Sequence, residues 1–482
     1  MSVITHVDLL KNRRTKIVAT VGPASASSEM LSDLITAGVN VFRLNMSHGD
    51  HAFHADVFRR IRNLGADASQ PVAILADLCG PKIRTGEFAG GSIDLTPGER
   101  VIMTVRDVEG TAGLIPSRYS ALADDVTAGD RILLDDGNLE LRVQGVAGTE
   151  INCEVVYGGR LSSNKGINLP SVVISTPSLT DKDRVDAAFA LELGVDFLAL
   201  SFVRSADDIH ALRELMSEHD NDAWIIAKIE KPEALTNANE ILAVTDGIMV
   251  ARGDLGVELP AEEVPLAQDQ LIALAREQMK PVIVATQMLE SMITQPRPTR
   301  AEVTDVSHAV IGGADAVMLS AETAAGDYPL EAVQMMDRIA RQFEAHLWGE
   351  GRYGEVTRSQ TPPLPIGNVM ANAVAHMSRD IEAHGVMVVS RSGMTAATVS
   401  AARPAAPIVA LMPTERVQRR MTLLWGVIPV HQTDAGRRNP NLLARTMARD
   451  LDLAAPGEYV LLVRGFHEDA MLNTPTVTIL TV

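Results

Sequence analysis

Short apolar runs alternate with helix-patterned stretches through the first two thirds of the chain. Eight runs are apolar along most of their length, as expected for strands buried on both faces. They lie at 16–22, 39–45, 72–78, 195–202, 224–230, 247–253, 281–286 and 316–322. Helical periodicity separates most of them, for example at 28–37, 52–64, 181–193, 205–218, 262–278 and 329–347. This pattern predicts an α/β protein with a closed (β/α)8 barrel, although an open doubly wound sheet would give a similar pattern.

Two segments depart from this alternation. Residues 85–169 lack helical periodicity and resemble short strands with turns, which predicts a small all-β domain, a β-barrel lid, inserted after the third strand. A proline-rich stretch at 358–367 marks a boundary. Five later runs, at 386–390, 407–412, 427–432, 459–465 and 477–482, predict an open sheet. We therefore expect a barrel domain at 1–84 and 170–350, the insert at 85–169, and a C-terminal α/β domain at 351–482.

Composition and charge exclude several classes of protein. The net charge of −18 argues against DNA or RNA as the main partner, since nucleic-acid binders carry basic surfaces. Cys79 and Cys153 are far apart and form no CxxC pair, which argues against a disulfide framework or zinc site and fits a reducing cytoplasm. No apolar run approaches 18 residues and the first residues lack a signal-peptide core, so we expect no membrane span.

Polar and charged residues gather where the predicted strands end. In an α/β barrel the reactive groups lie at the C-terminal ends of the strands. The residues at or just after these ends are Arg43, Asn45, Ser47, His48, Asp77, Lys82, Arg84, Ser201, Lys228, Glu230, Asp254 and Thr286. An acidic protein that binds phosphate must concentrate Lys and Arg locally, and several of these residues are basic.

Lys228 and Glu230 are two residues apart on one strand, so both side chains point to the barrel interior. Buried charges are costly unless they pair or bind a ligand, and an internal ion pair would explain these two by themselves. Asp254 follows the next strand within ARGDLG, however, and two carboxylates form a hard-oxygen site suited to Mg²⁺. Phosphoryl transfer needs such a metal together with cations, which Lys228, Arg43 and Arg84 could provide.

Nine segments, taken in order, resemble pyruvate kinase. They are TVGPAS (20–25), RLNMSHG (43–49), GPKIRTG (80–86), NLPSVVISTPSLTDKD (168–183), AKIEKPEAL (227–235), ARGDLGVELP (251–260), ATQMLESM (285–292), PTRAEVTDV (298–306) and DAVMLSAETAAGDYP (315–329). The resemblance runs from about residue 15 to 350, and the C-terminal pattern continues it. It implies transfer of a phosphoryl group from phosphoenolpyruvate to ADP, giving pyruvate and ATP in glycolysis.

The resemblance also implies roles for matching residues. Arg43 would bind the phosphoryl group, and Lys228 would stabilise that group and the enolate oxygen. Glu230 and Asp254 would hold Mg²⁺ (or Mn²⁺). Ser201, the backbone at Gly253 and the hydroxyl of Thr286 would meet the substrate, with Thr286 near the methylene carbon that accepts a proton. Residues expected to face the nucleotide are Arg84, Lys165, Asn45 and His48, with Lys165 brought in by closure of the insert.

This chain departs from the family at a monovalent-cation site. Many members bind K⁺ through the equivalents of Asn45, Ser47, Asp77 and residue 78, where Thr is usual and this chain has Leu78. An acid usually occupies the position of Lys82. Our hypothesis is that the Lys82 ammonium takes the place of K⁺, which would then not be required. The alternative is a solvated surface lysine.

A possible effector site lies in the C-terminal domain. The segment SRSGMT (390–395) joins a strand to a helix and offers N–H groups with the hydroxyls of Ser390, Ser392 and Thr395, a suitable phosphate cradle. An ordinary capped helix start is the alternative. The loop at 464–475 lacks the glycine-rich stretch that usually encloses fructose 1,6-bisphosphate, so another sugar phosphate or AMP is an equal candidate effector. The family is usually homotetrameric.

Two other functions fit parts of this pattern. A metal-dependent aldolase acting on pyruvate would also use Glu230 and Asp254, but it would not need Arg84, Lys165 or the insert. A non-catalytic sugar-phosphate sensor would use the C-terminal domain alone, but loss of Lys228 or of a metal ligand would then be expected. Formation of ATP separates the kinase from both.

Overall fold

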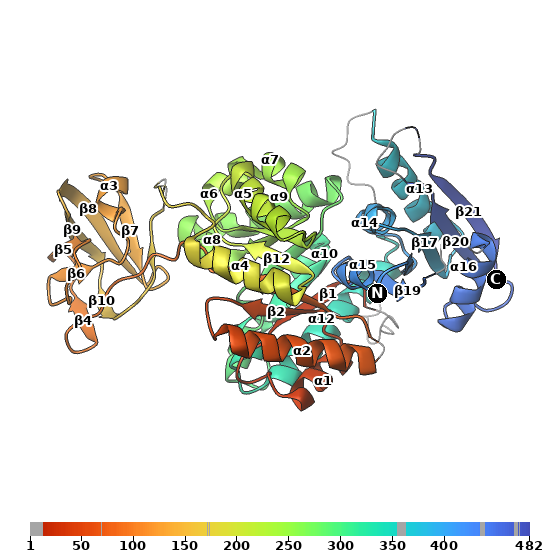
Figure 1. The fold of residues 1–482 in the computed structure, drawn as a ribbon, viewed down its shortest axis with the longest axis horizontal. Helices are drawn as coiled ribbons and strands as arrows, with labels where there is room; N and C mark the ends of the chain where they lie inside the picture. Colours follow the sequence, from red (N-terminus) through yellow and green to blue (C-terminus); the bar gives the residue numbers. More distant parts are fainter. Residues whose placement is uncertain are drawn as a thin grey trace, which may run out of the picture.

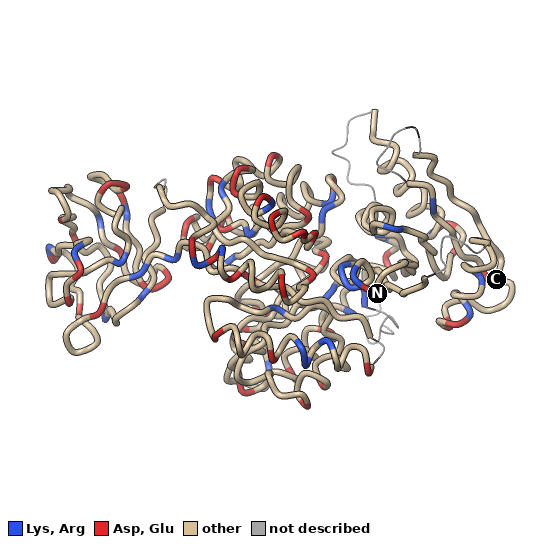
Figure 2. The backbone as a smooth tube through the Cα atoms, in the orientation of Figure 1, with Lys and Arg blue, Asp and Glu red and all other residues tan. Residues whose placement is uncertain are grey.

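The computed structural model describes residues 13–68, 70–170, 172, 174–353, 363–433, 439–466, 471 and 473–482. Figure 1 shows an elongated molecule with the barrel in the middle, the insert at one end and the C-terminal domain at the other. Acidic and basic residues are interspersed along all three parts (Figure 2). Within the described ranges, no helix is long and apolar enough to span a bilayer.

Eight parallel strands form the predicted closed barrel. In chain order they are β1 (Lys16–Thr20), β2 (Val41–Asn45), β3 (Ala73–Asp77), β12 (Phe197–Leu200), β13 (Trp224–Ile229), β14 (Gly247–Ala251), β15 (Val282–Ala285) and β16 (Ala316–Leu319). The order around the barrel is β1-β16-β15-β14-β13-β12-β3-β2, so the first and last strands pair and close it. Every expected barrel run contains one of these strands, which confirms the barrel over the open sheet.

Helices cover the outside of the barrel. The main ones are α1 (Ser28–Thr36), α2 (His51–Asp67), α4 (Asp181–Leu193), α5 (Ala206–Glu218), α7 (Ala238–Val244), α9 (Val264–Glu277), α10 (Arg300–Gly312) and α12 (Pro329–Gly349). Short segments are α6 (Pro232–Thr236), α8 (Arg252–Glu258), η1 (Ala261–Glu263), η2 (Glu290–Ile293) and α11 (Ala321–Ala324). Capping boxes begin three of these helices, at Thr180 with Asp183, at Ser205 with Asp208 and at Thr299 with Glu302.

A ring of Asn and Asp residues closes the N-terminal end of the barrel. Every second strand around the barrel is directly preceded by one of these residues. Its side chain accepts a hydrogen bond from the backbone N–H at the start of a neighbouring strand. The contacts join Asn40 to Ile17 (3.0 Å), Asp196 to Ile74 (2.9 Å), Asp246 to Ile225 (2.8 Å) and Asp315 to Val282 (3.1 Å). In the same order, the four side chains also accept from Arg13, Arg62, Arg213 and Arg403. These side chains therefore provide hydrogen-bond acceptors for backbone N–H groups at the start of the barrel strands, where no neighbouring strand provides one.

The C-terminal domain docks on this same end of the barrel. Leu423, from the C-terminal domain, is fully buried among the apolar side chains that fill the barrel interior. The Lys16 ammonium at the start of β1 donates to the carbonyl of Val427 at 2.7 Å. The opposite end, where the strands finish, is thereby left for the site.

The C-terminal domain contains all five predicted strands. They are β17 (Gly385–Val389), β18 (Ile408–Met412), β19 (Val427–His431), β20 (Tyr459–Arg464) and β21 (Thr476–Thr481). Their order is β19-β18-β17-β20-β21, with β21 antiparallel, which confirms an open α/β sheet. The helices are α13 (Ile366–Asp380), α14 (Met394–Ala401), α15 (Glu415–Met421) and α16 (Pro440–Asp450). Residues 358–362 of the predicted boundary lie outside the described residues.

The insert is all-β apart from one short helix. It comprises β4 (Ser92–Leu95), β5 (Arg100–Thr104), β6 (Leu114–Pro116), α3 (Leu122–Asp125), β7 (Arg131–Leu134), β8 (Leu139–Ala147), β9 (Glu150–Tyr157), β10 (Gly159–Ser162) and β11 (Ile167–Asn168). Strand β9 alternates buried and exposed residues, so one face packs on the insert's own core. The strands form a six-stranded and a two-stranded sheet instead of the single closed ladder that a β-barrel requires. The exact domain limits stay predictions.

Candidate active site

A cavity of about 770 Å³ opens where the barrel strands end. Predicted site residues from several strands line it: Arg43, Asn45, Ser47, His48, Asp77, Leu78, Lys82, Ser201, Lys228, Glu230, Asp254 and Thr286. Of the residues predicted for substrate, metal and monovalent cation, Gly253 is not among those lining the cavity, although its N–H contacts Thr286. Barrel closure therefore gathers residues from positions 43 to 286 in one place.

Lys228 lies at the centre of a buried charge network. Its ammonium is 2.8 Å from Glu230 Oε1 and 3.4 Å from Asp77 Oδ1, and it donates to Ser201 Oγ at 2.7 Å. Burial by itself would lower the pKa of Lys228, but the negative charges of Asp77, Glu230 and Asp254 outweigh burial and raise it. Lys228 is therefore a permanent positive charge facing the cavity.

Arg43 supplies the second cation and is held by two neighbours. Its Nε donates to Asp77 Oδ2 at 2.6 Å, and its Nη1 donates to Thr20 Oγ1 at 3.0 Å. Burial would raise the pKa of Asp77, but Lys228 and Arg43 overcome this and lower it. Asp77 thus stays ionised between two cations. Sequence reasoning missed Thr20, although it begins the TVGPAS motif.

Glu230 and Asp254 are the carboxylates available to a metal ion. The pKa of Glu230 lies above its ordinary value, because burial and the nearby charge of Asp254 disfavour ionisation more than Lys228 favours it. A divalent cation would reverse that balance. Among the described residues there is no group of three His, Cys, Asp or Glu side chains that could hold a metal. The pair therefore fits a hard cation such as Mg²⁺ only if substrate and water complete its coordination.

Ser201 and Phe202 fix the charged groups from the neighbouring strand. Ser201 Oγ donates to the carbonyl of Leu78 at 2.7 Å while accepting from Lys228, so it holds the ammonium in place. The N–H of Phe202 donates to Glu230 Oε2 at 2.7 Å. Phe202 has a φ of +55°, a conformation that bulky residues avoid, and such strain tends to persist at functional sites. The sequence contains no signal for this contact.

Thr286 is also held in a strained conformation. Its φ is +68°, unusual for a β-branched residue. Its Oγ1 donates to the carbonyl of Ala285 at 2.6 Å and accepts from the N–H of Gly253 at 2.7 Å. The predicted Gly253 backbone and Thr286 hydroxyl therefore lie together, bonded to each other at the edge of the cavity.

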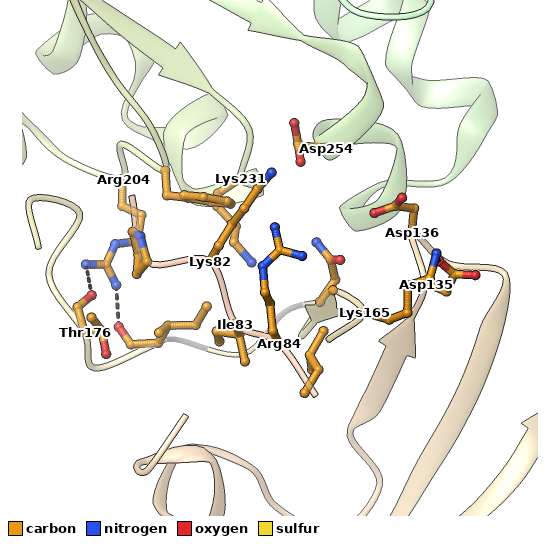
Figure 3. A pocket seen from close by; sticks show the side chains of 16 residues that line it. Lys82, Ile83, Arg84, Asp135, Asp136, Lys165, Thr176, Arg204, Lys231 and Asp254 are labelled. Atoms are coloured by element: carbon orange, nitrogen blue, oxygen red, sulfur yellow. Dashed lines mark hydrogen bonds and ion pairs between the residues drawn. The ribbon is translucent and has the colours of Figure 1, made fainter. Parts of the chain in front are cut away.

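A second cavity, of about 230 Å³, lies between the insert and the barrel. Lys82 and Asp254 line both cavities, and Arg84 and Lys165 line this one. Figure 3 shows Arg84 extending toward the side on which Asp254 lies, while Asp135 and Lys165 come from the insert. The Lys165 ammonium is 2.7 Å from Asp135 Oδ1, a partner that sequence reasoning missed, and this hydrogen bond raises the pKa of Lys165.

Two protein-family models match most of the chain. The family model of the pyruvate kinase barrel domain matches residues 12–333, and that of the pyruvate kinase alpha/beta domain matches residues 368–480. The chain belongs to the pyruvate kinase family. Its family membership confirms the enzyme class and favours the kinase over the aldolase and the sensor.

Individual pyruvate kinases resemble the chain over nearly its whole length. Pyruvate kinase 2 of Synechocystis sp. is 46% identical over 458 residues, which cover 94% of this chain and 76% of that protein. A pyruvate kinase of Agrobacterium vitis is 45% identical over 460 residues, 94% of each chain. The crystal structure of a pyruvate kinase from Cryptosporidium parvum matches with a TM-score of 0.91 at 35% identity, covering 98% of this chain and 97% of that one.

The residues at the family's K⁺ position line the larger cavity together with Lys82. Lys82 is exposed, and no side-chain hydrogen bond of its ammonium is seen within the described residues. Asn45 Oδ1 accepts from the N–H of Ser47 at 3.1 Å, and the carbonyl of Leu78 accepts from Ser201. The substitution of a monovalent cation by Lys82 stays a prediction for this pyruvate kinase.

His48 lies near the same cations. Burial, followed by the positive charges of Lys82, Arg84 and Arg43, lowers the pKa of His48 below its ordinary value. This shift favours the neutral ring of His48, which can accept a hydrogen bond from a ligand.

The predicted effector loop caps its own helix. Ser390 Oγ accepts from the N–H of Gly393 at 3.1 Å, and Ser392 Oγ accepts from the N–H of Met394 at 3.5 Å. Thr395 is buried. This geometry agrees with an ordinary helix start, and phosphate binding at this loop stays a prediction. Residues 467–470 and 472 of the later loop lie outside the described residues.

Replacing Thr286 by alanine should lower kcat by roughly ten- to a hundredfold, because a lost hydrogen bond at such a site costs about 1–3 kcal/mol. The matched variant Thr286→Ser keeps the hydroxyl and should retain most of the activity. Steady-state kinetics at saturating substrate measure both. Equal rates for Thr286→Ala and the unmodified chain would contradict a role for this hydroxyl.

Proposed function

We propose that this enzyme transfers the phosphoryl group of phosphoenolpyruvate to ADP, giving pyruvate and ATP in glycolysis. The observation that carries the proposal is the ammonium of Lys228, held among Asp77, Glu230 and Ser201 inside the larger cavity. The neighbouring cavity is lined by the positively charged Arg84 and Lys165, which suit the phosphates of a nucleoside diphosphate.

The protein's cations would stabilise the charge that develops during transfer. Arg43 offers guanidinium N–H groups to the phosphoryl oxygens, while Asp77 and Thr20 keep its orientation. Lys228 faces the transferring phosphoryl group and the enolate oxygen, so a fixed positive charge meets the negative charge that forms. Because neighbouring carboxylates keep Lys228 protonated, it serves as an electrostatic stabiliser and not as a base.

Glu230 and Asp254 would hold Mg²⁺ or Mn²⁺. When bound, the ion supplies positive charge and Lewis acidity to substrate oxygens. The two carboxylates supply only part of an octahedral shell, which leaves positions for phosphate and carboxylate oxygens of the substrate. The raised pKa of Glu230 supports this assignment, because burial and the negative charge of Asp254 disfavour its ionisation and a divalent cation would offset both.

Thr286 would then guide protonation of the enolate. Its hydroxyl donates to Ala285 and accepts from Gly253, so the oxygen is fixed in position at the cavity edge. A water molecule on this hydroxyl could deliver a proton to the methylene carbon. Arg84 and Lys165, with Asn45 and His48, would bind the nucleotide, and movement of the insert would exclude water.

Replacing Lys228 by methionine should abolish most ATP formation, with kcat falling by roughly a hundred- to a thousandfold, since removal of one such electrostatic group costs about that much. A coupled assay with phosphoenolpyruvate, ADP and Mg²⁺ measures the rate. The control is Lys280→Met, because the Lys280 ammonium donates to the Thr245 carbonyl before β14, away from the cavity. Normal turnover by Lys228→Met would rule out the proposed role.

We infer that K⁺ is not required, because Lys82 lines the cavity beside Asn45, Ser47 and Asp77. The unmodified enzyme should keep its rate when K⁺ is replaced by a bulky quaternary ammonium ion. Lys82→Gln should then become dependent on added K⁺, whereas Lys280→Gln should not. A collapse of the unmodified enzyme's rate in K⁺-free buffer would refute this idea.

We also infer that a phosphorylated sugar or AMP regulates the enzyme through residues 390–395. The glycine at the helix start and the hydroxyls of Ser390 and Ser392 support it, since a helix N-terminus favours phosphate and both hydroxyls lie against the N–H groups there. At least one such compound should lower the phosphoenolpyruvate concentration giving half-maximal rate, and Ser392→Glu should abolish this shift by charge repulsion. Ser32→Glu, on the exposed side of α1, is the control. No shift with any compound would contradict the proposal.

We expect a cytoplasmic homotetramer. This assembly is the usual one in the family.

A further inference from the structure

A second ion pair lies directly behind the two candidate metal ligands. Lys231 follows Glu230 in the chain, and Glu258 lies four residues after Asp254 on α8. The Lys231 ammonium is 2.6 Å from Glu258 Oε1, and the two side chains are only 5% and 1% exposed. Burying two charges is costly, and well-packed apolar residues would often stabilise a fold equally well. This cost suggests that the pair serves another purpose.

The local backbone explains why the two side chains meet. Lys228 and Glu230 point into the barrel, so the next residue along the extended chain points the other way. Pro232 keeps Lys231 extended, with φ −125° and ψ 147°, because proline disfavours helical conformation in the residue before it. On α8, residues four apart share a face, so Glu258 lies one turn beyond Asp254 on the same side.

The ion pair therefore ties together the two segments that carry the carboxylates. One end is attached beside Glu230 at the end of β13, and the other lies one helical turn from Asp254. The same carboxylate, Glu258 Oε1, also lies 3.4 Å from the amide nitrogen of Asn168 on β11, where the chain returns from the insert. Relative movement of β13 and α8 would have to break this buried contact.

We propose that Lys231 and Glu258 are positioning residues that set the spacing of Glu230 and Asp254, and thereby the affinity for a divalent cation. The inference rests on the proposed metal site. Groups behind metal ligands commonly tune affinity in this way, because they hold the ligands at the distance that the ion requires. Lys231 and Glu258 act through their neighbours and need no contact with the ion.

Mn²⁺ binding to the full-length, substrate-free protein tests the proposal without any measurement of turnover. Free Mn²⁺ is followed by electron paramagnetic resonance for Lys231→Met, Glu258→Gln and the double variant. Each should bind Mn²⁺ at least about tenfold more weakly than the unmodified chain. The control is Lys16→Met, which removes another buried lysine at the opposite end of the barrel and should leave Mn²⁺ affinity unchanged.

Thermal unfolding separates positioning from simple stabilisation. Each single variant leaves an unpaired buried charge and should lower Tm, whereas the double variant removes both charges and should recover much of that loss. Weak Mn²⁺ binding that persists in the double variant supports the proposal. Recovery of Mn²⁺ affinity together with Tm would overturn it, because the pair would then act only on stability.

Three further results are informative. If Glu230→Gln and Asp254→Asn lose Mn²⁺ while the Lys231 and Glu258 variants bind it normally, the positioning role is wrong and the metal site stands. If Glu230→Gln and Asp254→Asn both retain normal Mn²⁺ binding, the proposed metal site itself is wrong, and the positioning role falls with it. If Lys231→Met raises only the KM for ADP, Lys231 contacts nucleotide in the smaller cavity that it lines, and the positioning role is overturned.

Discussion

The mutual neutralisation of charges buried at the barrel mouth is the constraint on which the site depends. Lys228 and Arg43 place two largely buried cations at the barrel mouth, and Asp77 and Glu230 lie directly against them. Removing any one group would leave a net charge in this buried cluster, which is far more costly than the balanced set. The four residues come from β2, β3 and the end of β13, which are distant in the chain and are brought together by the strand order β2-β3-β12-β13. Site and fold are therefore coupled.

The two ends of the barrel use polar residues for different purposes. At the N-terminal end, Asn40, Asp196 and Asp315 accept strand N–H groups and pair with arginines, so their hydrogen bonds serve stability. At the C-terminal end, the charged groups face a cavity. Arg403, from the C-terminal domain, binds Asp315 and anchors that domain on the stabilised end. This division leaves the strand ends and the insert to form the site.

Backbone strain supports the same division of roles. Phe202 and Thr286, both with positive φ, each follow a barrel strand and hold a group of the site: the N–H that binds Glu230 and the hydroxyl that meets Gly253. A surrounding structure that is already rigid must maintain such conformations, because they are intrinsically unfavourable. The closed barrel provides that rigidity, and the ion pair of Lys231 with Glu258 extends it to α8.

The sequence by itself determined the elements and the faces of their side chains. Apolar runs located all eight barrel strands, and the two-residue spacing of Lys228 and Glu230 placed both in the interior, because strand geometry is local. The family motifs then pointed to the residues around the cavity. The residues that precede the strands, as in GVNVF, GVDFL and GADAV, repeat a pattern that could have revealed the ring of Asn and Asp. The shared role of these Asn and Asp residues becomes clear only from the order of the strands around the barrel.

Only the tertiary structure decided which groups pair. Strand order places Ser201 against Lys228, and Glu258 meets Lys231 across 27 residues of chain. Leu423 lies in the C-terminal domain, more than a hundred residues further along the chain than the last barrel strand, and packs into the barrel interior. A residue pattern specifies the direction in which a side chain points, but its partner depends on register and on how distant segments pack. Those relations arise from the packing of segments that are distant in the chain and cannot be derived from any single segment.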